Sequence, residues 1–219
     1  MGKGITREKI VTAALAVLDD GGIDAVTVRA VAARLDVKAP ALYFHVRNKQ
    51  ELLDEMGTEI HRRVVEALTG RTGAPHWHDD LAAYARALRA EYLAHRDGAR
   101  AFSGTLITDA DVLKAQEPWL RRWSAAGVPV TDAADAFEMV TAFVVGFVIE
   151  EQERLQSSRT DPERYSVPQR DQRLGAEVPL VVAAGHARRD HAARFERQLG
   201  VLIAGIGARL GGGPVSSSA

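Results

Sequence analysis

The chain contains no cysteine. This absence excludes a disulfide framework and any metal site built from thiolates, and it is compatible with a reducing cytoplasm. A long apolar run is also missing, because the most apolar stretch, residues 139–149, is too short to span a bilayer and is followed by Glu150 and Glu151. The first residues lack the apolar core of a signal peptide. We therefore expect a soluble cytoplasmic protein with no membrane partner.

A strong net charge of either sign is lacking as well, since 28 Lys and Arg residues are balanced by 29 Asp and Glu residues and the net charge is −1. This argues against a protein that coats nucleic acid with its whole surface. The charges are unevenly distributed, because residues 1–50 carry a net charge of +3 and the remainder carries −4. A basic head on an acidic body suits contact with phosphates at one end only.

The sequence shows no internal repeat and no strand-like alternation of apolar and polar residues, so the predicted fold class is all-α. Apolar residues at helical spacing predict a first helix over residues 6–18, which Gly21-Gly22 ends. A second helix begins after Thr27. A third, short helix is expected over residues 38–45, with Pro40 in its first turn, where proline costs little.

Further along the chain, Asn48 and Glu51 are spaced as in a capping box and predict the start of another helix, which reaches about residue 68. A loop is expected over residues 70–75, and the glycine- and serine-rich segment 211–219 is expected to be a disordered tail. The remaining helical patterns cover residues 77–95, 109–126, 131–156 and 188–210, with a shorter one near 176–186.

Residues 27–46 have the pattern of a helix-turn-helix unit. Two short helices that cross steeply need small side chains between them, which Ala32 and Ala33 supply. Asp36 occupies the turn, where its tolerance of left-handed backbone is useful. The second helix of such a unit enters the major groove of DNA with its early residues against base edges.

Within this head, Lys38, at the front of the second helix, is a candidate for reading bases, and Arg29 for gripping a phosphate or a guanine edge. Tyr43 can donate its hydroxyl to a phosphate, Phe44 can pack or touch a sugar, and Lys49 adds charge at a helix N-terminus. The alternatives are solvated or structural side chains. The full set of candidate DNA contacts is Thr27, Arg29, Lys38, Ala39, Pro40, Ala41, Tyr43, Phe44, His45 and Lys49.

An enzyme is the first alternative function, and the histidines would be its candidate catalytic residues. His76 and His78 are two residues apart and cannot share one helix face, while His186 and His191 flank a helix break. The sequence has no HExxH, no GxSxG and no glycine-rich phosphate loop after a strand. We therefore do not expect an enzyme.

Several segments resemble the TetR family of transcriptional repressors. The head motif is LYFHVRNK at 42–49 followed by ELLD at 51–54. In the body the similar segments are HRDGAR at 95–100, GT at 104–105, GFVIEEQE at 146–153 and FERQLGVLIAGI at 195–206. The likeness covers about residues 5–210, and the regulatory body is most like the tetracycline-repressor subclass.

This resemblance implies a DNA-binding domain over residues 1–49 and a helical ligand-binding and dimerisation domain over 50–210. It implies a homodimer, in which the helices near 131–156 and 188–210 pair with those of a second copy, and a palindromic operator in double-stranded DNA as partner. The apolar surface of the first helix is wider than one neighbour needs. The alternative is that these surfaces fill the core of a monomer.

The resemblance also implies a cavity for a small-molecule effector, which the tetracycline-repressor subclass fills with a magnesium chelate. The candidate ligand-binding residues are Val65, Tyr84, Leu88, Phe102, Thr105, Trp119, Trp123, Phe143, Phe147 and Glu150. Phe102 stands where that subclass has a metal-ligating histidine, and Val65 and Tyr84 replace two polar drug contacts. Thr105 and Glu150 alone make a poor metal site. We therefore expect no metal and no cofactor.

These replacements favour a hydrophobic or aromatic effector held by a few polar anchors. The expected function is a repressor that such an effector releases from DNA. Two alternatives remain open: the apolar residues can simply fill the cavity, or a protein partner can control DNA binding without any small molecule.

Overall fold

The computed structural model describes residues 4–69 and 76–211. All regular secondary structure in these residues is helical, which confirms the predicted fold class. The expected loop at 70–75 and nearly all of the expected tail at 211–219 lie outside the described residues.

The head begins with α1 (Arg7–Gly21) and α2 (Val28–Arg34). Thr6 caps α1 by accepting a hydrogen bond from the Lys9 amide, and Thr27 caps α2 in the same way through the Ala30 amide at 3.0 Å. Gly22 ends α1 with a φ of 78°, a conformation that glycine adopts without strain. These helix boundaries agree with the signals in the sequence.

The third helix of the head is shorter and tighter than predicted. Instead of an α-helix over residues 38–45, the structure has one 3-10 turn, η1 (Ala39–Ala41), followed by hydrogen-bonded turns over 42–45. The amides of Ala41 and Leu42 donate to carbonyls three residues earlier, as a 3-10 helix requires. Pro40 lies in the first turn of η1, where its missing amide hydrogen costs no helical hydrogen bond.

The helix α3 (Lys49–Leu68) leads from the head into the body. Asn48 caps it by accepting from the Glu51 amide at 2.9 Å. The return bond of the predicted capping box is shifted by one residue, because the Glu51 carboxylate accepts from the amide of Arg47 rather than that of Asn48.

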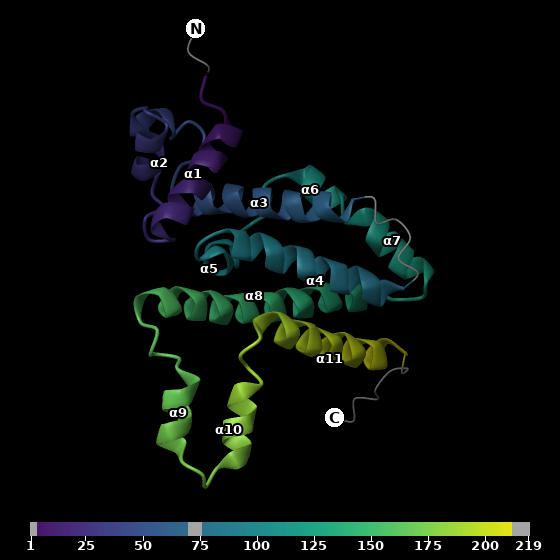
Figure 1. Ribbon diagram of the computed structural model, residues 1–219. Helices are drawn as coiled ribbons and strands as arrows, with labels where there is room; N and C mark the ends of the chain where they lie inside the picture. Colours follow the sequence, from purple (N-terminus) through teal and green to yellow (C-terminus); the bar gives the residue numbers. More distant parts are fainter. Residues whose placement is uncertain (1–3, 70–75, 212–219) are drawn as a thin grey trace, which may run out of the picture.

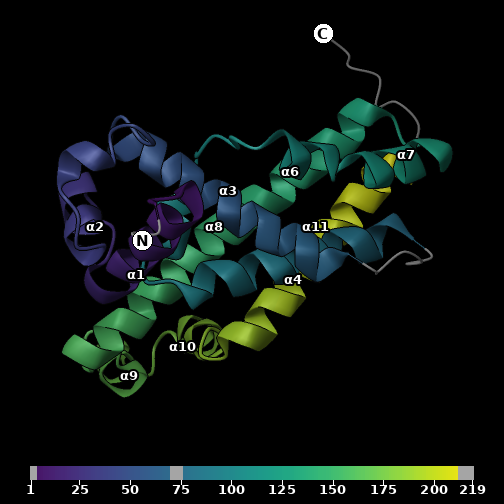
Figure 2. The same cartoon turned by 90° about the horizontal axis from the view of Figure 1, so that it is seen from above.

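The body consists of three stacked helices with shorter ones around them (Figure 1). α4 (Trp77–Ala94) lies between α3 and α8 (Val130–Thr160), and α11 (His191–Gly211) packs against both α4 and α8. Figure 2 shows from above that α3 and α4 lie over α8. The remaining helices are α5 (Gly98–Phe102), α6 (Ala110–Lys114), α7 (Glu117–Ala125), α9 (Val167–Leu174) and α10 (Pro179–His186).

Three parts of the body differ from the sequence prediction. The expected helix over 109–126 is divided into α6 and α7, with Pro118 in the first turn of α7. α8 continues four residues past the predicted end at 156, into a polar segment. α9 also begins in that segment, where Ser166 caps it and Pro168 lies in its first turn. Polar residues there conceal the periodicity that predicts a helix.

One contiguous hydrophobic core runs from the head into the body. Ile10 of α1, Leu42, Met56 of α3 and Leu88 of α4 are all fully buried. Each such side chain contributes about 1.5–3 kcal/mol by leaving water. The position of the head is therefore coupled to the packing of the body. Over 4–69 and 76–211, no helix has both the length and the hydropathy to cross a membrane.

Candidate DNA-binding surface and ligand cavities

The turn between α2 and η1 is held by a left-handed residue. Asp36 has a φ of 54°, and the next amide, that of Val37, donates to the carbonyl of Ala32 at 3.0 Å. This confirms the expectation of a tight turn at Asp36. Leu42 and Val46 are fully buried in the hydrophobic core and anchor the segment of residues 38–45, called the reading segment below.

None of the ten candidate DNA contacts is buried. Phe44 is 90% exposed and Tyr43 is 49% exposed, so neither ring is part of the core. For Phe44 this removes the packing alternative within the chain. Lys38 and Arg29 are exposed and form no ion pair with any described residue. The segment thus presents a surface with two unpaired cations and an exposed aromatic pair, which suits contact with phosphates, sugars and base edges.

Two basic residues after the reading segment are bound within the head. Lys49 Nζ donates to the carbonyl of Ile23 at 2.8 Å, which ties the start of α3 to the loop after α1. Arg47 donates to the Glu51 carboxylate at 2.7 and 2.9 Å. The hydrogen bonds from Arg47 lower the pKa of Glu51 and keep it ionised. A phosphate contact by Lys49 stays a prediction.

Two neighbouring cavities lie in the body, beside α3. The inner cavity has a volume of about 100 Å³, and the outer, more open one has a volume of about 560 Å³. His61 and Phe137 line both of them. Among the candidate residues, Val65, Tyr84 and Trp119 line the inner cavity, and Phe102 and Thr105 line the outer one.

The wall between α7 and α8 is aromatic. Phe137 stacks on Trp119 and Trp123, with ring centroids 6.0 and 5.1 Å apart, and Tyr84 meets it edge-on at 5.3 Å. Such pairs add about 0.5–1.5 kcal/mol each to the effect of burial. Trp123 Nε1 donates to the carboxylate of Asp80 at 3.1 Å, which orients the cluster.

Polar anchors are few in this wall. The Tyr84 hydroxyl forms a 2.9 Å hydrogen bond with the Thr141 hydroxyl, and burial raises the pKa of Tyr84. His61 is partly buried, and burial lowers its pKa, so its neutral form is favoured. The sequence analysis did not include His61 or Phe137 among the candidate ligand-binding residues. The signal for His61 is a polar residue beside the apolar positions Ile60 and Val64 of α3.

Five candidate ligand residues line neither cavity. Leu88 is fully buried in the core, and Trp123 is buried within the aromatic wall. Phe143 and Phe147 pack against Phe195 of α11, with ring centroids 5.5 and 5.2 Å apart. Of the candidates Trp119, Trp123 and Phe143, only Trp119 therefore lines a cavity, because the position of Phe143 on α8 directs it toward α11.

Glu150 is the fifth of these residues. It forms ion pairs with Arg154 and Arg194, each at 3.0 Å. Burial alone would raise the pKa of Glu150, but the two arginines outweigh burial and lower it.

The fold and these two sites define a helix-turn-helix regulator with a helical body. A family model described as "Bacterial regulatory proteins, tetR family" matches residues 10–56, and one described as "Tetracyclin repressor-like, C-terminal domain" matches residues 69–210. The chain belongs to the TetR family of transcriptional regulators. This family consists of regulators rather than enzymes.

Three individual proteins illustrate the similarity. The class A tetracycline repressor from Escherichia coli is 37% identical over 147 residues, which are 65% of this chain and 65% of that protein. A possible TetR family transcriptional regulator from Streptomyces coelicolor A3(2) is 35% identical, with a TM-score of 0.77, and the match covers 93% of this chain and 100% of that one. A TetR variant from Acinetobacter baumannii AYE in complex with minocycline is 28% identical, with a TM-score of 0.71, over 94% of this chain and 98% of that one.

The residues of the outer cavity do not fit a magnesium chelate. Thr105 Oγ1 donates to the carbonyl of Phe102 at 2.9 Å, and Phe102 itself offers no ligand. The Glu150 carboxylate is committed to two guanidinium groups. In the part of the chain that the structure describes, no three His, Asp or Glu residues are grouped so that they could hold a metal ion.

Proposed function

We propose that this protein is a cytoplasmic homodimeric repressor that binds a palindromic operator and is released by a small hydrophobic or aromatic effector. The observation that carries the proposal is that α3 connects the head to the cavities of the body. Its first residue, Lys49, is bound to the head through Ile23, and its residues His61, Val64 and Val65 line the inner cavity. A ligand in the body therefore acts on the same rigid helix that positions the head.

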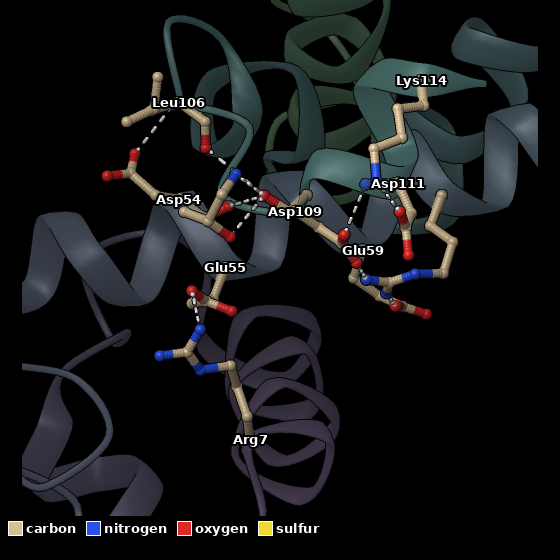
Figure 3. A network of polar contacts seen from close by, with 11 residues as sticks. Arg7, Asp54, Glu55, Glu59, Leu106, Asp109, Asp111 and Lys114 are labelled. Atoms are coloured by element: carbon tan, nitrogen blue, oxygen red, sulfur yellow. Dashed lines mark hydrogen bonds and ion pairs between the residues drawn. The ribbon is translucent and has the colours of Figure 1, made fainter. Parts of the chain in front are cut away.

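A polar network supports this coupling (Figure 3). On the body side, Asp54 accepts from the Leu106 amide at 3.1 Å, and Arg62 pairs with Asp109 at 2.8 Å. On the head side, Glu55 pairs with Arg7 of α1 at 3.1 Å. The segment that begins with the cavity residue Thr105 is thus bonded to α3 close to Glu55, the residue through which α3 contacts α1.

Two states follow from this arrangement. Without ligand, the network holds the heads of the dimer at the spacing of one operator. A ligand that displaces Phe102 or Thr105 shifts the bonded segment and α3 with it, which moves the heads out of register. The ligand can do this only through a higher affinity for the released state.

Exposed apolar surface on α8 and α11 supports the dimer. Val201 is 75% exposed and Met139 is 45% exposed, and a Cβ atom at Gly200 or Gly205 would have no other described helix within 4 Å. Helices with small residues on an open face allow close approach of another helix. A second copy would cover this surface, as the resemblance implies.

The cavities favour an effector with an apolar, planar body. Trp119 and Phe137 offer ring faces, and Tyr84 and His61 offer single polar contacts. The minocycline complex of the Acinetobacter relative supports a small-molecule site in this body, whereas the unsuited metal ligands argue against a magnesium-bound drug here.

The test has three steps. Sequences bound by the purified protein are selected from random duplex DNA, which is expected to yield a palindrome bound by one dimer. A thermal-shift screen with aromatic compounds then identifies ligands of the folded state, because these raise its melting temperature. Finally, each ligand is titrated into the protein–operator complex. Unchanged operator affinity with every stabilising ligand would refute release, and a screen without any ligand would favour control by a protein partner.

A further inference from the structure

A cleft rich in arginine lies in the part of the chain between α8 and α11. α9 and α10 pack against each other and extend from the body on the side of α8 opposite to the head (Figure 1). The cleft between them and the end of α8 has a volume of about 360 Å³. Among the described residues no Asp or Glu lines it, and the arginines that do are Arg154, Arg164, Arg170, Arg173, Arg188 and Arg189.

Only half of these arginines are neutralised by direct ion pairs. Arg154 pairs with Glu150 at 3.0 Å, Arg164 with Glu153 at 3.5 Å and Arg170 with Asp171 at 3.0 Å.

The other three, Arg173, Arg188 and Arg189, form no ion pair with any described residue, and Arg189 acts on Asp171 only at longer range. Like charges that converge on one cavity repel one another unless an anion is present. The cleft is therefore positively charged after all its direct ion pairs are counted.

Specific packing holds Arg170 in place. Its guanidinium lies directly against the backbone of Gly185, where any Cβ atom would overlap with it. Arg170 Nη2 also donates to the carbonyls of Val181 and Val182 at 3.1 and 3.0 Å. Gly185 thus provides a notch for a guanidinium group, which a loose surface arginine would not need.

Three buried side-chain nitrogens of residues that line this cleft lack hydrogen-bond partners among the described residues. They are the Nε atoms of Arg154 and Arg170 and the Nδ1 atom of His191. The guanidinium of Arg154 lies over the ring of Tyr165, 4.9 Å from its centroid, which fixes its plane. Buried donors without acceptors are rare in folded proteins, and a bound acceptor is one explanation for them.

We infer that this cleft binds a small molecule through a phosphate group. A phosphate offers acceptor oxygens and up to two negative charges, and the planar guanidinium matches it with paired hydrogen bonds. The volume is at the lower end of the range for small-molecule sites, which leaves room for a phosphate and a compact organic body. A DNA backbone is disfavoured, because the arginines line a cleft beside α9 and α10, and these helices lie on the far side of α8 from the head.

Binding is tested by calorimetry and thermal shift with the full-length protein. Inorganic phosphate, pyrophosphate and glycerol 3-phosphate are titrated at constant ionic strength, with sodium chloride as the reference. We expect saturable binding of one phosphate compound per chain and a higher melting temperature. The three probes distinguish free phosphate from a phosphate ester as the preferred form.

Variants connect the binding to the cleft. R173Q/R188Q removes two unpaired charges and should weaken phosphate binding by about ten-fold or more. G185A, which displaces the guanidinium of Arg170, should weaken it as well. R159Q is the matched control, because Arg159 is exposed and unpaired but lies outside the cleft. Circular dichroism confirms that each variant is folded.

Three results would overturn the inference: no saturable binding by any of the probes, equal weakening in R159Q, or unchanged affinity in R173Q/R188Q. A fourth result would replace the inference with a nucleic-acid surface. In that case R173Q/R188Q binds duplex DNA less tightly than the parent protein, and the phosphate probes do not bind the parent protein. Operator recognition by the head is measured separately and is not required for this site.

Discussion

Thr105 fills a notch that Gly57 leaves in the middle of α3. A Cβ atom at Gly57 would overlap with the side-chain oxygen of Thr105 and lie 2.9 Å from its Cβ. This contact joins the outer cavity to the helix that carries the head. It explains why a glycine is tolerated inside a long helix, where it ordinarily costs about 0.5–1 kcal/mol relative to alanine.

The first prediction concerns this contact. Gly57→Ala should lower the free energy of unfolding by about 1–3 kcal/mol, because the clash outweighs the gain in helix propensity. Urea denaturation measures it. The double variant G57A/T105G removes the clashing side chain and should recover most of the loss. Equal destabilisation of the single and double variants would contradict the close contact between Gly57 and Thr105.

The second prediction concerns base reading by Lys38, the residue that precedes η1. Lys38→Ala should change the sequence selected from random DNA, since a bidentate contact to a base edge provides about 1–3 kcal/mol of discrimination. Lys114→Ala in α6 is the control, because it removes a lysine far along the chain from the head. An unchanged selected sequence with a smaller salt dependence would instead assign Lys38 to a phosphate.

The third prediction concerns the inner cavity. Val65→Trp adds a large side chain to a space of about 100 Å³ and should abolish the stabilisation by compounds that raise the melting temperature of the parent protein. Operator affinity is measured in parallel, because a Trp side chain that shifts α3 in the way proposed for the effector should lower it. Leu113→Trp, at a half-exposed position that lines neither cavity, should respond to the compounds like the parent. If both variants respond like the parent, effectors bind elsewhere.

The fourth prediction concerns pH. Burial lowers the pKa of His61 below 6.5, its ordinary value, so the unfolded chain takes up a proton at a higher pH than the folded protein does. The contribution of His61 to stability is therefore lost as the pH falls from about 6.5 to the pKa in the folded state. His61→Gln should lose less stability than the parent over this interval, measured by urea denaturation at a series of pH values.

The exposed His78 provides the comparison for this measurement. His78→Gln should keep the acid response of the parent, because the side chain is exposed to solvent. The prediction fails if the H61Q and H78Q variants respond to acid in the same way.

Local signals predicted the head well. Thr6, Thr27 and Asn48 act as caps, and Asp36 adopts the left-handed turn, because each of these features depends on backbone groups within four residues. The length of the third helix was not predictable in this way. Pro40 permits both an α-helix and a 3-10 turn, and packing of Leu42 and Val46 against the rest of the head accompanies the shorter form.

The cavities show the limit of sequence reasoning. The aromatic wall joins Tyr84, Trp119 and Phe137, which come from three helices, and Phe143 points to α11 although it lies only six residues after Phe137. Helical spacing thus determined the fold class, and the motifs of the head and the body indicated the family. Only tertiary packing decided which apolar side chains line a cavity and which fill the core, because that depends on contacts between residues far apart in the chain.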